Sequence, residues 1–342
     1  MSSKPRIILG LMAFGPAEGV PMGARLHAVS DLTAALDKFQ ARGFTELDTA
    51  RGYGCGQQEG YTRQAGWKER GLSVGTKVFP MPPGTHAPES ITREFEKSLA
   101  ELGTDCVDIA YLHAPDRSVP FAATLEAMNA LHQSGKFRQL GLSNYAAFEV
   151  AEMVTLCTAK GWVRPTVYQG VYNCLQRGIE PELLAACRRY GLSFIAYSPT
   201  AGGLLSGKFT SPTDVPAEGR FSNQFLGGWA RQQVFKQGMF EALAVLRGVA
   251  ERNGVGMMEV GLRWIRHHSK LDLGGGDGVV VGVSRLEHLD QNLDALEKGP
   301  LDDELLGAVE RAYAVARAEE GPYWFGELKY GYDTKEVLFG EK

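Results

Sequence analysis

Four polar residues of types that can pass a proton between them stand at or just after the ends of short apolar runs. Asp48 lies near the end of the run 45–50, and Tyr53 follows five residues later in a glycine-flanked turn. Lys77 and His113 end two later runs. Each residue alone has an ordinary explanation, as a helix cap, a turn residue, a solvated lysine or a structural histidine. If the runs are neighbouring parallel strands, their carboxyl ends meet at one face and bring the four side chains together.

The chemistry that these four groups could perform together is proton transfer to a carbonyl oxygen. A tyrosine with a pKa of about 10 is a poor acid at neutral pH, and an adjacent ammonium such as that of Lys77 lowers this pKa. Asp48 could keep the lysine charged and oriented, while His113 could hydrogen-bond the carbonyl oxygen. No protein side chain donates hydride, so a reduction would also need a nicotinamide.

Three further strand ends offer a place for a nicotinamide. One run ends in Ser143 and Asn144, whose side chains can hydrogen-bond an amide, and the next ends in Gln169. A third ends in Tyr197-Ser198-Pro199. The ring of its tyrosine could stack on a nicotinamide.

A glycine-rich segment follows this third run and reads Gly202-Gly203-Leu204-Leu205-Ser206-Gly207-Lys208-Phe209. It nearly matches the P-loop of nucleotide hydrolases, but Phe209 stands where a Mg²⁺-binding serine or threonine is required. This mismatch argues against nucleotide hydrolysis. A glycine-rich backbone with one lysine still suits a pyrophosphate.

The last apolar run ends in Gly282-Val283-Ser284-Arg285, and the helix predicted after it carries His288, Gln291 and Asn292. A helix N-terminus after the last strand is the usual phosphate site of a barrel. Arg285 suits the 2′-phosphate of NADP by a charge-assisted contact. The ordinary alternative is a helix cap beside a solvated arginine.

The elements that must position these residues are short strands alternating with helices. Eight apolar runs predict strands, at 7–12, 45–50, 72–78, 107–112, 137–142, 166–171, 192–197 and 279–283. Helical spacing predicts helices from a Ser30-Asp31 cap to Gly43, up to Gly71, and at 89–102, 121–134, 147–160, 180–190, 239–252, 257–268, 286–296 and 302–319. The runs lack polar alternation, which is typical of parallel strands covered on both faces.

Eight such units in 342 residues predict an α/β fold, a closed (β/α)8 TIM barrel. A doubly wound open sheet is the alternative, although the first strand–helix turn lacks the GxGxxG fingerprint. The surplus residues predict a long loop after strand 7 (201–238), with Phe221, Phe225 and Trp229, and a C-terminal helix plus tail containing Tyr323-Trp324-Phe325. No linker divides the chain, so we predict one domain over 1–342.

The composition is that of an ordinary globular protein, with 44% hydrophobic residues, 22% charged residues and a formal net charge of -4. Neither sign of charge dominates, so neither nucleic acid nor a membrane surface is an expected partner. No apolar run is long enough to span a membrane, and residues 1–5 lack the apolar stretch of a signal peptide, so we expect a cytoplasmic protein. The five cysteines are scattered without a CxxC pair, which argues against disulfides or zinc.

These motifs together resemble the aldo-keto reductase superfamily of NADP-dependent (β/α)8 carbonyl reductases. The resemblance rests on Leu47-Asp48-Thr49-Ala50 with Tyr53, Thr76-Lys77, Tyr111-Leu112-His113, Gly141-Leu142-Ser143-Asn144, Tyr168-Gln169, Ala196-Tyr197-Ser198-Pro199 and Gly282-Val283-Ser284. Further segments are similar to the aflatoxin-aldehyde reductase subgroup, which reduces dicarbonyls, nitrobenzaldehydes and succinic semialdehyde. They are His113-Ala114-Pro115-Asp116, Pro165-Thr166-Val167-Tyr168-Gln169-Gly170 and the segment from Ala201 to Lys208.

The resemblance implies a small-molecule carbonyl substrate, with Tyr53 as general acid and Asp48, Lys77 and His113 completing a catalytic tetrad. It implies NADP(H) held by Met12, Asp48, Ser143, Asn144, Gln169, Tyr197, Ser198, Pro199, Gly202, Gly203, Leu204, Ser206, Lys208, Arg220, Gly282, Ser284, Arg285, His288, Gln291 and Asn292. The substrate contacts that it implies are Met12, Tyr53, His113, Trp229 and Arg231. Members of the subgroup are commonly dimers, so a homodimer is the oligomer to test.

The C-terminal tail departs from the subgroup pattern. Relatives acting on succinic semialdehyde carry a Tyr-Phe-Arg ending and a loop arginine that face the substrate carboxylate. Here the tail reads Tyr323-Trp324-Phe325-Gly326, and Arg231 is the candidate loop arginine. We therefore expect apolar or aromatic aldehydes to be preferred over acidic ones.

Two other classes of protein compete with a reductase. An NADPH-binding regulatory or sensor subunit with slow or no turnover could share the barrel and the tetrad, as channel β-subunits do, but the barrel is expected to start near residue 6, without their N-terminal inactivating extension. A metal-dependent barrel hydrolase needs several histidine and carboxylate ligands at strand ends. Only His113 is so placed, since His267 and His268 lie near a helix end.

Overall fold

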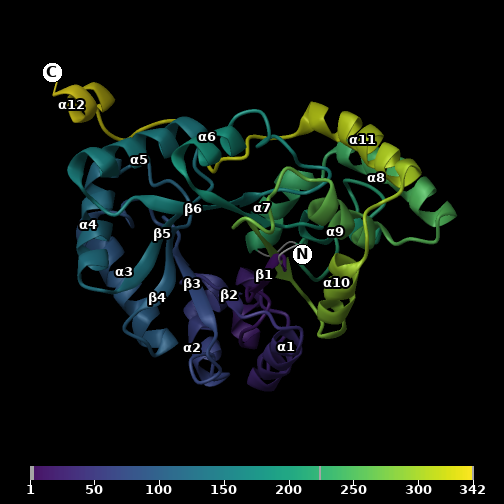
Figure 1. Cartoon of the computed structure of the whole chain (residues 1–342), viewed down its shortest axis with the longest axis horizontal. Coiled ribbons are helices and arrows are strands. Elements are labelled where there is room, and N and C mark those ends of the chain that lie inside the picture. Colours follow the sequence, from purple (N-terminus) through teal and green to yellow (C-terminus); the bar gives the residue numbers. More distant parts are fainter. Residues whose placement is uncertain (1–3, 223–224, 341–342) are drawn as a thin grey trace.

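Eight parallel strands close into a barrel in the computed structural model, which describes residues 4–222 and 225–340 (Figure 1). The strands are β1 (Arg6–Gly10), β2 (Glu46–Asp48), β3 (Ser73–Val78), β4 (Val107–Leu112), β5 (Phe137–Ser143), β6 (Pro165–Val171), β7 (Ser193–Tyr197) and β8 (Gly278–Gly282). Each strand pairs with its sequence neighbour, and β1 also pairs with β8 over its whole length. The predicted (β/α)8 barrel is confirmed, and the open-sheet alternative is wrong.

Helices surround the strands, as Figure 1 shows. They are α1 (Val29–Ala41), α2 (Gln58–Gln64), α3 (Pro88–Leu102), α4 (Phe121–Gln133), α5 (Ala147–Lys160), α6 (Leu183–Tyr190), α7 (Phe225–Val234), α8 (Gln237–Arg252), α9 (Met257–His267), α10 (Glu287–Glu297), α11 (Asp303–Ala316) and α12 (Thr334–Phe339). Short 3₁₀ helices are η1 (Ala17–Met22), η2 (Tyr53–Gly56), η3 (Ala201–Ser206) and η4 (Arg317–Glu319). Helix α3 illustrates why these segments are helical. Its apolar residues recur at helical spacing on one face, and this face is buried: Ile91, Phe95, Leu99 and Leu102.

Several predicted boundaries are wrong. Helix α1 begins at Val29 rather than after a Ser30-Asp31 cap, because the Asp31 carboxylate instead accepts a hydrogen bond from the backbone N–H of Ala28 at 3.3 Å. Helix α6 begins at Leu183 rather than at residue 180. The strands predicted at 7–12 and 45–50 are longer than β1 and β2.

The segment 201–238, predicted to be a loop, contains η3 and α7. Ala230 and Val234, four residues apart, are buried on one side of α7. Helix α7 packs against η1 and η3, which lie far from it in the sequence. The helix is therefore stabilised by tertiary packing that the local sequence does not reveal.

The inside of the barrel is filled by a small apolar cluster of Ile8, Ile109, Tyr111, Val167, Ile195 and Val280. The Tyr111 ring fits only because β5 has a glycine opposite it. A Cβ added at Gly141 would lie 2.3 Å from Cδ1 of that ring. The Tyr111 ring thereby packs near the ammonium of Lys77, whose Nζ lies 5.9 Å from the centre of the ring.

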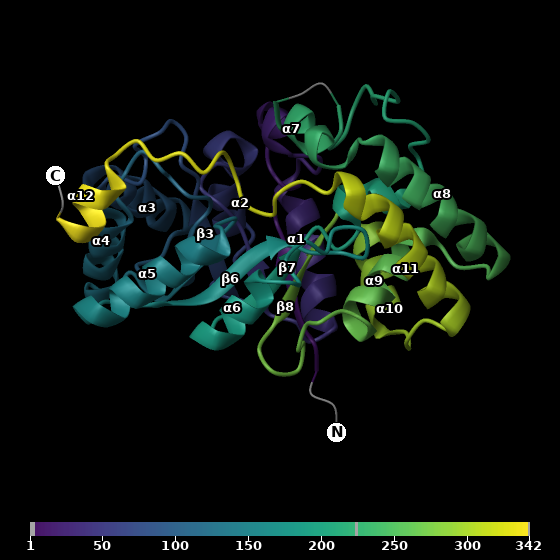
Figure 2. The ribbon, with the colours of Figure 1, turned by 90° about the horizontal axis from the view of Figure 1, so that it is seen from above.

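The C-terminal tail runs back across one end of the barrel. In Figure 2 the yellow segment after α11 runs over the strands to α12, on the side of the barrel that carries α4. Among residues 4–222 and 225–340, no helix is both long and apolar enough to cross a membrane. All five cysteines lie in these ranges and carry free thiols.

Candidate active site

An ion pair at the ends of β2 and β3 forms the base of the site. Nζ of Lys77 lies 2.7 Å from Oδ2 of Asp48, and the lysine side chain is 0% exposed. The ammonium also donates to the backbone carbonyl of Thr49 at 2.7 Å, and Nε2 of Gln169 donates to the other oxygen of Asp48 at 2.7 Å. Burial has the largest single effect on Lys77 and would lower its pKa, but Asp48 and Tyr53 together outweigh burial, so the pKa is raised and the lysine stays charged.

Tyr53 lies directly beside this pair. Nζ of Lys77 is 5.0 Å from the centre of the Tyr53 ring. Burial raises the pKa of the phenol above its usual value, although Lys77 acts in the opposite direction. The net lowering expected from the sequence is therefore wrong for the protein without ligands, because removal from water outweighs the ammonium.

His113 completes the group of four. Its ring meets the Tyr53 ring edge-on, with 5.9 Å between the ring centres. Burial, followed by the nearby charge of Lys77, holds the pKa of His113 well below its usual value, so the imidazole is neutral. Its Nδ1 is buried and has no hydrogen-bond partner among the described residues. The structure thus brings together all four residues singled out from the sequence.

The turn that carries Tyr53 is held by a buried carboxylate that the sequence reasoning missed. Arg51 forms an ion pair with Glu59, which is 0% exposed, and also donates to the backbone carbonyl of Gly56 at 2.7 Å. The hydroxyl of Thr76 donates to the same carboxylate at 2.6 Å. This network ties the Tyr53 turn to β3 one residue before Lys77. The sequence feature that could have indicated this network is the charged residue Arg51, which stands between Asp48 and Tyr53.

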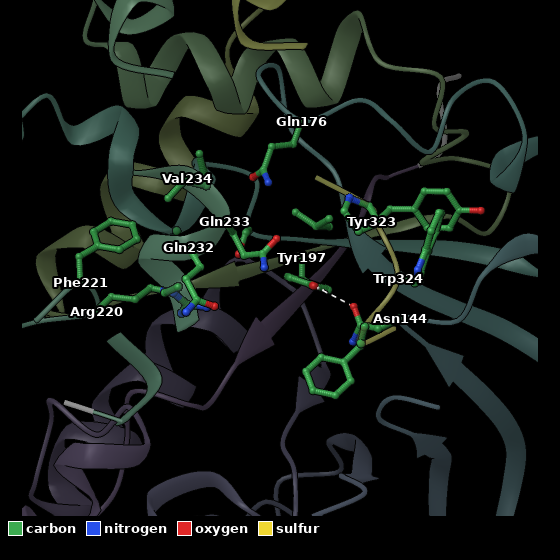
Figure 3. A pocket seen from close by; sticks show the side chains of 18 residues that line it. Asn144, Gln176, Tyr197, Arg220, Phe221, Gln232, Gln233, Val234, Tyr323 and Trp324 are labelled. Atoms are coloured by element: carbon green, nitrogen blue, oxygen red, sulfur yellow. Dashed lines mark hydrogen bonds between the residues drawn. The ribbon is translucent and has the colours of Figure 1, made fainter. Parts of the chain in front are cut away.

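A pocket of about 350 Å³ lies next to Asn144 and Tyr197, and none of the four tetrad residues lines it (Figure 3). Several residues predicted from the sequence line it: Asn144, Tyr197, Ser198, Gly202 and Arg220. The Tyr197 hydroxyl donates to Oδ1 of Asn144 at 2.9 Å, the contact dashed in Figure 3. Nδ2 of Asn144 donates to the backbone carbonyl of His113 at 2.9 Å, which connects the pocket wall to the tetrad.

Other lining residues were not predicted individually. They come from α7 and from the C-terminal tail, and include Gln232, Gln233, Val234, Tyr323, Trp324 and Phe325. The tail therefore reaches the face of the barrel that carries Asn144 and Tyr197. Gln176 lies after β6 and was missed because no strand-end motif marks it.

The glycine-rich segment after β7 forms a turn of left-handed residues. Ser198, Ala201, Gly202 and Gly203 have φ angles of 55°, 52°, 67° and 98°. Successive residues in such conformations direct backbone N–H groups to a common point and favour anions. No atom lies within 4 Å of the place where a Cβ of Gly203 would stand, so the turn is open there.

A cationic cluster lies at the start of α10. The Ser284 hydroxyl and Nδ1 of His288 are 3.2 Å apart, and Nδ2 of Asn292 donates to the carbonyl of Gly282 at 3.3 Å. Burial lowers the pKa of His288, and the neighbouring charges of Lys208 and Arg285 lower it further. The structure therefore brings two distant predicted segments together at one positively charged surface.

The other site residues predicted from the sequence lie in different parts of the structure. The Arg231 guanidinium donates to the backbone carbonyls of Phe221, at 2.6 Å, and Ser222. Trp229 belongs to α7, but its side chain lies outside the described part of the chain. Met12 is half-buried after β1, and Gln291 is exposed on α10. Ser143 is the last residue of β5, and three more predicted residues follow β7: Pro199, Leu204 and Ser206.

Within the residues that the structure describes, no group of three or more His, Cys, Asp or Glu side chains could hold a metal ion. A barrel that gathers a carboxylate, a phenol, an ammonium and an imidazole at its C-terminal rim has the fold and the polar groups of a (β/α)8 oxidoreductase.

Comparison with known proteins gives the family. The model of the aldo/keto reductase family matches residues 6–314, and the chain belongs to this family. It is 42% identical over 335 residues to mouse aflatoxin B1 aldehyde reductase member 2, covering 94% of this chain and 88% of the relative. It is 39% identical over 333 residues to human aldo-keto reductase family 7 member A3, covering 94% and 98%.

A fungal aldo-keto reductase from Pseudocercospora fijiensis is 42% identical over 294 residues, covering 84% of this chain and 99% of the relative. These relationships support an oxidoreductase that reduces carbonyl groups, in a family that generally uses a nicotinamide cofactor.

Proposed function

We propose that this protein is an NADPH-dependent carbonyl reductase that converts an aldehyde, or a reactive ketone or dicarbonyl, into an alcohol with Tyr53 as proton donor. The observation that carries the proposal is the buried Lys77–Asp48 pair, 2.7 Å between Nζ and Oδ2, beside the ring of Tyr53 and the neutral ring of His113. Both the ammonium and the imidazole can serve a carbonyl oxygen that gains negative charge.

The tetrad residues have distinct tasks in this proposal. A nicotinamide held in this pocket would supply hydride to the carbonyl carbon. Tyr53 keeps its proton at neutral pH because burial raises its pKa, and it gives that proton to the carbonyl oxygen. Lys77 stabilises the phenolate left behind, and Asp48 keeps Lys77 charged. His113, neutral at this pH, donates an N–H to the carbonyl oxygen and orients it.

The residues present fit NADP(H). The open turn at Gly202-Gly203, with Lys208, suits the pyrophosphate, and Tyr197 offers a ring for the nicotinamide. Ser284, Arg285 and His288 suit the 2′-phosphate. The remaining proposed contacts are Met12, Asp48, Ser143, Asn144, Gln169, Ser198, Pro199, Leu204, Ser206, Arg220, Gly282, Gln291 and Asn292.

The aromatic tail supports the preference for apolar or aromatic aldehydes. Tyr323, Trp324 and Phe325 line the pocket, and Arg231 already donates to two backbone carbonyls. The name of the mouse relative, aflatoxin B1 aldehyde reductase member 2, also favours an aldehyde substrate. Met12, Tyr53, His113 and Trp229 complete the proposed substrate contacts.

Steady-state turnover of a panel of aldehydes, followed by NADPH oxidation, tests the proposal. We expect 4-nitrobenzaldehyde to be reduced in many cycles per protein molecule, and succinic semialdehyde to have a lower kcat/KM. Tight NADPH binding without turnover of any aldehyde would instead indicate a regulatory or sensor subunit. Comparable kcat/KM for the two aldehydes would contradict the substrate preference.

We also propose that the protein acts in the cytoplasm as a homodimer, as expected from the sequence and the resemblance. Light scattering of the purified protein and fractionation of the source cells test these two points separately.

A further inference from the structure

The tail segment Tyr323–Gly326 forms one wall of the pocket and lies close to the tetrad. The Phe325 ring packs edge-on against Phe79, with 5.1 Å between centres. Phe79 packs in the same way against His113 at 5.4 Å. A single ring, that of Phe79, therefore separates the Phe325 ring from the imidazole.

This segment is held by an arginine that the catalytic scheme does not use. Arg117 follows β4, and its Nε and Nη2 bind the two oxygens of Glu149 at 2.7 and 2.9 Å. Its remaining nitrogen, Nη1, donates to the backbone carbonyls of Phe325 at 2.6 Å and Glu327 at 3.1 Å. The backbone N–H of Gly331 in turn donates to the carbonyl of Arg117 at 2.7 Å.

Glu149 connects the same arginine to the part of the pocket wall that carries Asn144. It lies in the first turn of α5, and its Oε2 accepts the backbone N–H of Ala146 at 2.8 Å. The Tyr330 hydroxyl donates to its Oε1 at 2.8 Å. Just before α5, the carbonyl of Asn144 accepts the backbone N–H of Phe325 at 2.9 Å. The Arg117–Glu149 ion pair thus connects the tail, α5 and the pocket wall.

The chemistry of this pair suits a positioning task. The side chains of Arg117 and Glu149 are 7% and 0% exposed. A buried ion pair is weak support for stability, because desolvation offsets its attraction, but it fixes geometry when all its hydrogen bonds are made. Arginine is needed here, since its planar fork binds a carboxylate with two nitrogens and leaves the third, Nη1, for the tail carbonyls.

We propose that Arg117 and Glu149 are positioning residues that set the substrate-facing wall of the pocket by fixing Tyr323–Gly326 across the barrel mouth. They act through Trp324 and Phe325 and do not touch the reacting atoms. This inference rests on the proposed function for its kinetic consequence: the pair determines how well large aromatic aldehydes bind, and it leaves the reduction of small aldehydes unchanged.

The test is Arg117→Met, which removes the guanidinium and keeps an unbranched side chain. We expect KM for 4-nitrobenzaldehyde to rise about tenfold, the size of effect that a misplaced pocket contact produces, while kcat for a three-carbon aldehyde stays within about twofold. Hydrogen exchange should show faster exchange of the Phe325 and Gly331 amides.

Arg188→Met is the matched control. Arg188 also binds a buried carboxylate with two nitrogens, to Asp277 at 2.9 and 2.5 Å, but at the opposite end of the barrel, before β7 and β8 begin. Its loss should reduce stability without changing KM for either aldehyde. If Arg117→Met is too unstable, Arg117→Met with Glu149→Gln avoids an unpaired buried carboxylate and should show the same rise in KM.

Three outcomes would overturn the inference. One is an unchanged KM for 4-nitrobenzaldehyde in the Arg117 variants, and another is an equal rise in the Arg188 variant. The third is unchanged exchange of the Phe325 and Gly331 amides, which can be measured even if the wild-type protein reduces no aldehyde. Absence of wild-type turnover would contradict the proposed function alone.

Discussion

At the scale of single residues, the site depends on two opposite effects on Tyr53. Burial disfavours the phenolate, and the ammonium of Lys77 favours it. Burial dominates in the structure, so the phenol is protonated at neutral pH, as the proposed role of general acid requires. The ammonium of Lys77 lies close enough to stabilise the phenolate that this role would produce.

Replacing Tyr53 by phenylalanine tests this role. The ring beside Lys77 remains, so NADPH affinity should stay within about twofold, whereas kcat should fall about a hundredfold to ten-thousandfold because the proton donor is lost. Fluorescence titration with NADPH and steady-state kinetics measure the two quantities. Retention of more than about a tenth of the wild-type kcat would remove Tyr53 from the role of general acid.

The pH dependence of kcat/KM for reduction follows from two shifted pKa values. The pKa of His113 lies well below its usual value, so the imidazole stays neutral over the ordinary pH range. Its protonation should therefore cause no loss of activity as pH falls from 8 to about 6. Tyr53 must be protonated and its pKa is raised, so activity should fall only as pH rises above about 10. A profile that declines with a midpoint near 6.5 would contradict the neutral imidazole.

Arg285→Ala tests the predicted 2′-phosphate site. The loss of a charge-assisted contact should weaken NADPH about tenfold and leave NADH almost unchanged, because NADH lacks the phosphate. Dissociation constants for the two cofactors give the answer directly. Glu287→Ala, next along the start of α10, is a control that removes the opposite charge. Equal weakening of NADPH and NADH would mean that Arg285 does not contact the phosphate.

At the scale of elements, the sequence predicted what is local and missed what is assembled from distant segments. The strand ends bearing Asp48 and Lys77 were predictable because apolar runs and polar residues adjoin in the sequence. Helix α7 could not be predicted in this way, because its buried face forms by packing against η1 and η3. The contact between Arg117 and the carbonyl of Phe325 spans 208 residues, and no pattern in either segment announces it.

The packing of β5 against β4 gives a prediction at this scale. Gly141→Ala would place a methyl group 2.3 Å from the Tyr111 ring, in the middle of a strand that cannot move away. Overpacking of this kind costs about 1–3 kcal/mol, which urea unfolding can measure. Gly299→Ala is the control, because nothing lies within 4 Å of its Cβ position. Equal stability of the two variants would show that β5 adapts.

At the scale of the whole molecule, closure of the barrel makes every strand depend on two neighbours. Strands β1 and β8, from opposite ends of the sequence, pair over five residues each. We therefore predict that the chain behaves as one domain with one cooperative unfolding transition. Circular dichroism and tryptophan fluorescence should give coincident urea curves, and saturating NADPH should raise the midpoint. Two separated transitions would contradict a single domain over 1–342.

The path of the C-terminal tail has a consequence for protein synthesis. The four tetrad residues all lie before residue 114, while Trp324 and Phe325 lie far later in the chain. During translation, the strand ends that carry the tetrad are therefore made well before the tail residues that line the pocket. The pocket wall is complete only when residues 323–326 fold back across the barrel.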